Sequence, residues 1–218
     1  REVDIMRSKF DEQLGELNQQ LIQMGQAIEK NIQDAIDALV NGNVEKANLI
    51  KSSDDDIDKM QREIENICFS LLMRQQPVAK DLRTITAAMK MVTDMERIGD
   101  HSVDISEMTE FLASHKMNDN LEVLKHMASE ATVMLIHSID AFTEKNADIA
   151  KEVIIHDDVV DALFVSVKDE LIKLIQDNPA EGESGLDILM IAKYLERIGD
   201  HATNIAEWVL YSLDDKRE

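Results

Sequence analysis

Glu96-Arg97-Ile98-Gly99-Asp100-His101 occurs a second time, letter for letter, at residues 196–201. Two copies of one hexapeptide in a chain of 218 residues indicate a duplicated structural unit. The repeat also places a glutamate and an aspartate at the same point of each unit. The fold and the chemistry are therefore best read by comparing one half of the chain with the other.

The two halves correspond well beyond the hexapeptide. Asn43 matches Asn146, and the acidic run 54–58 matches 157–161, both at an offset of 103 residues. At the hexapeptide the offset is 100 residues. We attribute this change of offset to the loop before the third helix of each half, because surface loops tolerate changes in length.

Apolar residues recur every three or four positions through most of the chain, which is the spacing of a helix face. The chain has only 7 Gly and 2 Pro and is 4% aromatic, which favours helices over a turn-rich sheet protein. Breaks at 41–43 and at Gln76-Pro77 separate three helices in the first half, the last ending near Ser114. In the second half the predicted helices are about 119–144, 147–176 and 186–213, with a loop at 178–185.

The predicted fold is all-α, a tandem repeat of two similar three-helix bundles related by a pseudo-two-fold. Six long helices build it, three in each half. The predicted domains are residues 1–115 and 116–218.

The net charge is −21, from 44 acidic and 23 basic residues. Such a chain repels nucleic acid and anionic lipid surfaces, so cations and basic protein surfaces are its expected partners. No apolar run approaches the ~18 residues that a membrane span needs, so we expect no direct membrane insertion. The single cysteine, Cys68, fits a reducing cytoplasm, and we expect a cytoplasmic protein.

Acidic residues pair at a spacing of four in both halves, which places both carboxylates of a pair on one helix face. Like charges at this spacing cost roughly 0.2–0.5 kcal/mol a pair, and a bound cation would remove that cost. Asp104 and Asn204 follow one turn later with further oxygen donors. The predicted metal ligands are Asp54, Asp58, Glu96, Asp100 and Asp104 in the first half, and Asp157, Asp161, Glu196, Asp200 and Asn204 in the second.

Oxygen ligands suit hard or borderline cations such as magnesium, manganese, calcium or iron, with zinc possible. Gly99 and Gly199 lie inside the paired motifs, where a helical glycine costs about 1 kcal/mol relative to alanine, so something must need the space. The alternative is that the acids pair with Arg97, Arg197 or lysines, or face water. A helix turns 100° per residue, so neither His101 nor His201 need join a site.

The sequence resembles the PhoU family of phosphate-transport regulators. The resemblance is carried by the segment 74–83, by Glu96-Arg-Ile-Gly-Asp100 with Ile105, and by Glu196-Arg-Ile-Gly-Asp200 with Asn204-Ile205, and it extends over essentially the whole chain. It implies two three-helix bundles with metal clusters, of iron or of other metals such as zinc, manganese or magnesium. The ligands would be the paired acidic motifs Asp54–Asp58, Glu96–Asp100, Asp157–Asp161 and Glu196–Asp200.

The resemblance also implies a negative regulator of phosphate uptake and of phosphate-starvation signalling, not an enzyme. Its implied partners are the ATPase subunit of the phosphate ABC transporter and a phosphate sensor histidine kinase, and we also expect a homodimer. The alternative is a carboxylate-bridged di-metal enzyme or metal-storage bundle. Such bundles usually supply Glu-x-x-His pairs, and no histidine of this chain has a glutamate three residues before it.

Overall fold

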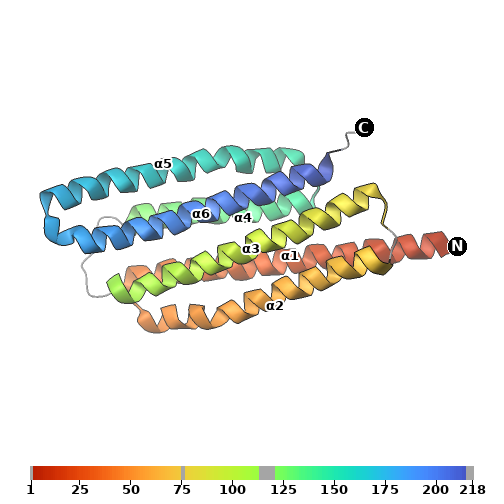
Figure 1. Ribbon diagram of the computed structural model, residues 1–218, viewed down its shortest axis with the longest axis horizontal. Coiled ribbons are helices and arrows are strands. Elements are labelled where there is room, and N and C mark those ends of the chain that lie inside the picture. Colours follow the sequence, from red (N-terminus) through yellow and green to blue (C-terminus); the bar gives the residue numbers. More distant parts are fainter. Residues whose placement is uncertain (1, 75–76, 113–120, 215–218) are drawn as a thin grey trace.

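Six helices lie side by side in the computed structural model, which describes residues 2–74, 77–112 and 121–214 (Figure 1). No strand occurs within these ranges, so the predicted all-α fold is confirmed. A short 3-10 turn, Pro179–Glu181, leads into the last helix. The helices are α1 (Glu2–Asn41), α2 (Val44–Arg74), α3 (Ala79–Leu112), α4 (Leu121–Thr143), α5 (Ala147–Asp177) and α6 (Gly182–Leu213).

The helices group into two bundles of three, as the repeat predicted. Helices α1, α2 and α3 pack on one another, and so do α4, α5 and α6. The bundles join where α3 lies against α6 and where α1 lies against α4. In Figure 1, α3 and α6 run antiparallel in front, with α1 and α4 behind them. The predicted domain boundary at residue 115 lies outside the described residues.

The turn between the first two helices of each bundle has the same geometry in both halves. Gly42 and Lys145 both adopt a left-handed backbone conformation, with φ of 61° and 56°. The next residues, Asn43 and Asn146, each donate a backbone hydrogen bond to the carbonyl five residues earlier, at 2.8 and 2.9 Å. Each asparagine Oδ1 also accepts from the N–H three residues on, at 3.0 and 3.3 Å, and so caps the following helix.

One predicted boundary needs correction, because α6 begins at Gly182 rather than near residue 186. The predicted loop 178–185 is therefore helical from Gly182 onward. Ser184 Oγ donates to the carbonyl of Glu181 at 3.1 Å, which supports the first turn. A β-carbon on Gly185 would stand 3.1 Å from Ile175 Cδ1, so this glycine lets α6 start close against α5.

Buried apolar side chains from all six helices form one continuous core, including Leu21, Ile98, Leu135, Val160 and Leu195. Apolar burial is the main favourable contribution to folding, and here it also fixes which faces of α2, α3, α5 and α6 remain outside. Among the described helices, none combines the length and the apolar character needed to cross a membrane.

Candidate functional site: two acidic helix pairs

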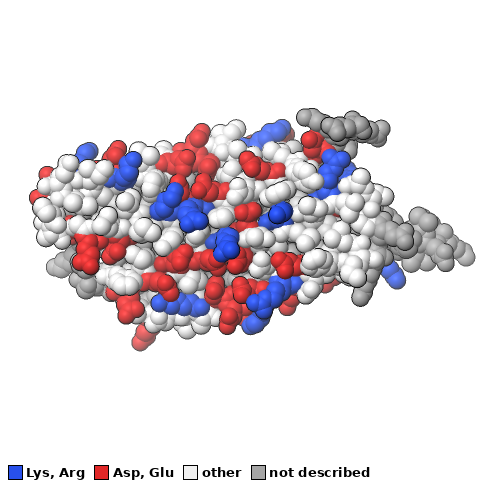
Figure 2. Space-filling model, viewed as in Figure 1, with Lys and Arg blue, Asp and Glu red and all other residues white. Residues whose placement is uncertain are grey.

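The predicted acidic residues lie on α2 and α3 in the first bundle and on α5 and α6 in the second. Figure 2 shows acidic side chains gathered over the middle of the face that these four helices present, with basic side chains among them. We call Asp54, Asp58, Glu96, Asp100 and Asp104 the first acidic site. We call Asp157, Asp161, Glu196 and Asp200 the second acidic site.

A close contact between α2 and α3 brings the pairs of the first acidic site face to face. Gly99 lies between Glu96 and Asp100, and a β-carbon there would stand 3.1 Å from Ile57 Cγ2. Ile57 in turn lies between the two aspartates of α2 and is buried. The sequence expectation that Gly99 makes space is thus confirmed, and a neighbouring helix occupies that space.

The carboxylates of the first acidic site influence one another across the helix pair. Burial raises the pKa of Asp54, and the charges of Asp100, Asp58 and Asp104 raise it further. Burial also raises the pKa of Glu96, with Asp100 adding to the effect. Burial and like charge both disfavour the ionised form, and a compensating cation would oppose both effects.

Basic side chains compensate part of this charge. Arg97 lies 2.9 Å from Asp100 Oδ2 and 3.6 Å from Glu96 Oε2. Arg62 lies 3.0 Å from Asp58 Oδ2. The arginine side chains of these pairs are exposed, and exposed pairs contribute only about 0–1 kcal/mol each. The alternative given by the sequence, in which the acids pair with Arg97, is thus observed for Glu96 and Asp100.

In the second acidic site the central carboxylate is Asp157. Burial raises its pKa to about 6, and the charges of Asp161, Asp200 and Glu196 act in the same direction. Asp157 Oδ1 is buried and finds no hydrogen-bond partner among the described residues. A β-carbon on Gly199 would stand 3.1 Å from that same oxygen. Glycine thus leaves room for the carboxylate, whereas in the first site it leaves room for an isoleucine.

These features fit a bound cation. A buried carboxylate oxygen without a partner is costly unless something pairs with it. Oxygen donors from two helices are the ligand type that hard cations prefer. Within the described residues, however, no three His, Cys, Asp or Glu side chains are arranged so that they could hold a metal ion as they stand.

Asn204 faces the neighbouring bundle. Its Nδ2 donates to Asp94 Oδ1 of α3 at 3.3 Å, and His201 Nδ1 donates to the same oxygen at 2.8 Å. Asn204 is therefore tied to the α3–α6 interface, one turn beyond Asp200. The repeat pattern does not single out Asp94, because its counterpart in the second half is Tyr194 and the two share no chemistry.

His101 is also an interface residue, with only 6% of its surface exposed. Its Nδ1 lies 3.1 Å from Asp104 Oδ2, while its Nε2 has no partner among the described residues. The ring stacks on Tyr194 at 5.7 Å and lies 5.7 Å from the ring of His201. The spacing of seven residues could have predicted this contact. It places Asp94 and His101 on one face of α3, and Tyr194 and His201 on one face of α6.

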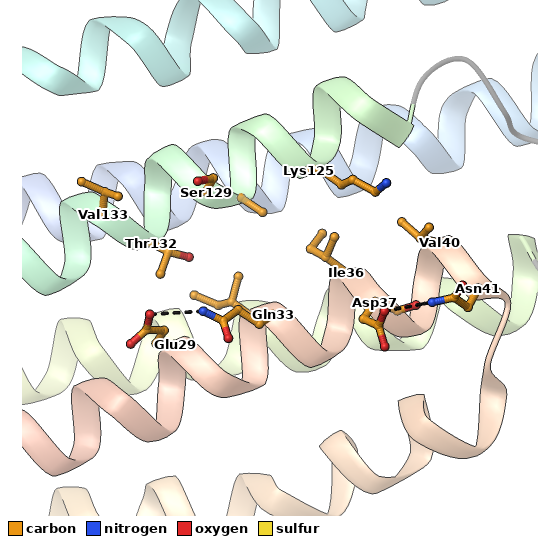
Figure 3. A pocket seen from close by; sticks show the side chains of 12 residues that line it. Glu29, Gln33, Ile36, Asp37, Val40, Asn41, Lys125, Ser129, Thr132 and Val133 are labelled. Carbon is orange, nitrogen blue, oxygen red and sulfur yellow. Dashed lines mark hydrogen bonds between the residues drawn. The ribbon is translucent and has the colours of Figure 1, made fainter.

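A groove of about 590 Å³ lies between α1 and α4, on the side away from α3 and α6 (Figure 3). Its apolar lining includes Ile36 and Val133, and its polar lining includes Glu29 and Asp37 of α1 and Lys125 of α4. No residue of either acidic site lines this groove. No local pattern in the sequence predicts this groove, since its two walls come from different halves of the chain.

Comparison with known proteins agrees with this architecture. A family model described as the PhoU domain matches residues 21–109 and again residues 124–209. A phosphate-specific transport system accessory protein PhoU homolog of Clostridium acetobutylicum is 39% identical over 212 residues, covering 97% of each chain. The homolog of that name in Pseudomonas aeruginosa is 34% identical, over 93% of this chain and 84% of its own.

Solved structures show the same fold. The crystal structure of PhoU from Pseudomonas aeruginosa superposes with a TM-score of 0.88 at 34% identity, over 94% of this chain and 98% of that one. The phosphate transport system regulatory protein PhoU from Streptococcus pneumoniae superposes with a TM-score of 0.85 at 30% identity. That match covers 93% of this chain and 96% of the other.

Proposed function

Because this chain belongs to the PhoU family, we propose that it is a cytoplasmic negative regulator of phosphate uptake that binds metal ions at its two acidic sites. In this role it links a high-affinity phosphate ABC transporter to a sensor histidine kinase and has no catalytic activity of its own. The names of its relatives support the link to phosphate transport.

The observation that carries the metal-binding part is the buried, unpartnered Oδ1 of Asp157 beside Gly199. Asp157, Asp161, Glu196 and Asp200 would hold an ion in the second site. In the first site the corresponding ligands would be Asp54, Asp58, Glu96 and Asp100, with Asp104 beside them. A bound ion supplies positive charge, which relieves the repulsion between the two helices of each pair.

Metal analysis tests this part of the proposal. The full chain is purified without added metal, and iron, zinc, manganese and magnesium are quantified by mass spectrometry. We expect bound metal in the unaltered protein and a loss of about half of it in each of Asp100→Ala and Asp200→Ala. Equal metal content in all three proteins would overturn the ligand assignment. Glu107→Ala, on an exposed face of α3, serves as the matched control.

Gene deletion tests the regulatory part. We expect deletion to raise expression of phosphate-starvation genes when phosphate is plentiful, and the intact gene to restore repression. Unchanged expression in a strain with no second copy would contradict the proposal. A ferroxidase assay on the metal-loaded protein addresses the enzyme alternative, for which turnover would be required.

A further inference from the structure

The groove between α1 and α4 begins beside a close contact of these two helices. A β-carbon on Gly25 of α1 would overlap Ile139 Cδ1 of α4, so the helices nearly touch at this point. They run antiparallel (Figure 1), and the groove lies on one side of the contact, where its α1 wall extends from Glu29 to Asn41. By the rise of an α-helix this wall is about 18 Å long, or about three turns.

The groove stays open because its two walls differ in the size of their side chains. The aliphatic side chains of α1 are large, and those opposite them on α4 are small. They are Ile32, Ile36 and Val40 of α1, and Ala128, Ser129 and Thr132 of α4. Figure 3 shows Ile36 and Val40 pointing toward α4 and Thr132 pointing back toward α1. Ile32 and Ile36 also belong to the buried core, so close packing holds this lining in place before anything binds.

The shape of the groove fits a third helix. Its volume of about 590 Å³ opens to solvent along one side, whereas a small-molecule site encloses most of its ligand. Helices pack with their side chains interdigitated, and a helix bound in a groove presents apolar side chains at every third or fourth position. The apolar residues of the α1 wall recur at intervals of four, so they can accept such a row.

One charged side chain of the groove has no ion-pair partner in the described part of the chain. Asp37 already lies 2.6 Å from Lys46, and Lys125 lies 2.6 Å from a neighbouring glutamate. Within the described residues, Glu29 accepts a hydrogen bond only from the neutral amide of Gln33, at 3.2 Å. Glu29 is half-buried, so a cationic side chain that reached it would form an ion pair partly shielded from water.

We propose that the groove between α1 and α4 binds an amphipathic helix of a partner protein, with a basic side chain of that helix at Glu29. The apolar face of the helix packs on Ile32 and Ile36. A second copy of this chain is a poor occupant, because two chains of net charge −21 repel each other. Neither acidic site contributes to the groove, so docking there does not depend on the proposed metal binding.

The test uses the full chain and a designed helical peptide of about 15 residues, near the length at which isolated helices become stable. The peptide is alanine-based, with leucine at every third or fourth position and one arginine beside this row. In a second peptide, glutamate replaces the arginine. We expect fluorescence anisotropy to show the arginine peptide binding at least about tenfold more tightly, because like charges across an interface are strongly unfavourable. Glu29→Lys should reverse this preference.

Two results would overturn the role of Glu29 and the groove. One is an absence of binding by both peptides to the unaltered chain. The other is an unchanged preference for the arginine peptide in Glu29→Lys. A reversed preference is specific to direct contact, because a general loss of structure would weaken both peptides alike.

A steric variant shows whether the peptide lies in the groove. Ser129 is an exposed lining residue, so Ser129→Trp places an indole in the groove and leaves the core unaltered. We expect it to weaken binding of the arginine peptide at least about tenfold. Ser166→Trp, at an exposed position of α5, is the matched control and should bind normally. Thermal unfolding of both variants checks the fold, and equal affinities in the two would contradict the proposal.

Sedimentation of the unaltered chain and of Ser129→Trp tests the other occupant. We expect the same oligomeric state in both proteins, because the groove of each chain stays open for a partner. A dimer that becomes a monomer in Ser129→Trp would show that a second copy fills the groove, and the proposal would be wrong. Asp100→Ala and Asp200→Ala should bind the peptide normally, so failure of docking and failure of metal binding are distinct results.

Discussion

Asp157 Oδ1 lies 3.1 Å from the point that a β-carbon on Gly199 would occupy. In the first bundle the group at this distance from Gly99 is a methyl of Ile57 instead. The equivalent glycines of the repeat therefore make room for different groups. Gly199 makes room for the Asp157 carboxylate, and Gly99 makes room for the Ile57 side chain. This difference gives the two positions different responses to the same substitution.

Gly199→Ala should weaken Mn²⁺ binding at the second acidic site several-fold, roughly the effect of disturbing a ligand's surroundings. The added methyl forces Asp157 to shift by a few tenths of an ångström, whereas alanine itself favours the helix by about 1 kcal/mol over glycine. Thermal unfolding should therefore show little loss of stability. The matched variant Gly99→Ala should leave Mn²⁺ affinity at the second site closer to normal. Equal losses in both would contradict this account.

The raised pKa of Asp157 predicts a pH dependence of stability in the metal-free protein. Folded Asp157 titrates at about 6 and an ordinary aspartate at 3.8, so between these values the folded state binds the extra proton. Its contribution to the free energy of unfolding is thus present below pH 3.8 and is lost as the pH rises to about 6. Urea unfolding of Asp157→Asn in chelator should show a flatter profile over this range. Parallel profiles for the two proteins would rule the assignment out.

Added metal should stabilise the folded chain. A ligand that binds only the folded state at 100 times its Kd stabilises it by about 2.7 kcal/mol for each site. We expect Mn²⁺ to raise the midpoint of thermal unfolding, and chelator to reverse the rise. Removing both Asp54 and Asp58 should reduce the gain to that of one site. No change in midpoint at saturating Mn²⁺ would exclude binding specific to the folded state.

Lys145→Gly should stabilise the protein by about 1 kcal/mol. Lys145 has φ of 56°, and a side chain in this left-handed region costs about 1–2 kcal/mol, partly offset by the greater entropy of unfolded glycine. The converse change, Gly42→Ala, places a β-carbon at φ of 61° and should destabilise by a similar amount. Chemical unfolding measures both. Changes of the same sign in the two variants would refute the equivalence of these turns.

Much of the fold could be predicted from local patterns. The spacing of apolar residues gave all six helices, and Asn43 and Asn146 marked the turns, because capping and helix periodicity act over a few residues. The start of α6 was predicted too late, since Gly182 and Gly185 look like loop residues in sequence. Their place in the helix depends on packing of Gly185 against Ile175 of α5, a contact that local patterns do not contain.

The acidic sites, too, could be predicted only in part from the sequence. Spacing by four placed Glu96 with Asp100, and Asp54 with Asp58, on shared helix faces, and the structure brings these pairs together across α2 and α3. Asn204 was grouped with the second site by the same rule, yet its amide bonds to Asp94 of the other bundle. Asp104 holds the equivalent position in the first half and its charge still acts on Asp54, so the neighbour opposite, and not the spacing along the helix, decides where Asn204 is held.

The sequence by itself determined the helices, the duplication and the faces on which carboxylates gather, because a rotation of 100° per residue fixes which side chains share a face. Only the tertiary structure decided what lies opposite each face. Packing of α3 against α6 placed His101 beside His201 and gave Asp94 its partners from the second bundle. These contacts join segments about one hundred residues apart, and they exist because burying the apolar faces of both bundles brings those two helices together.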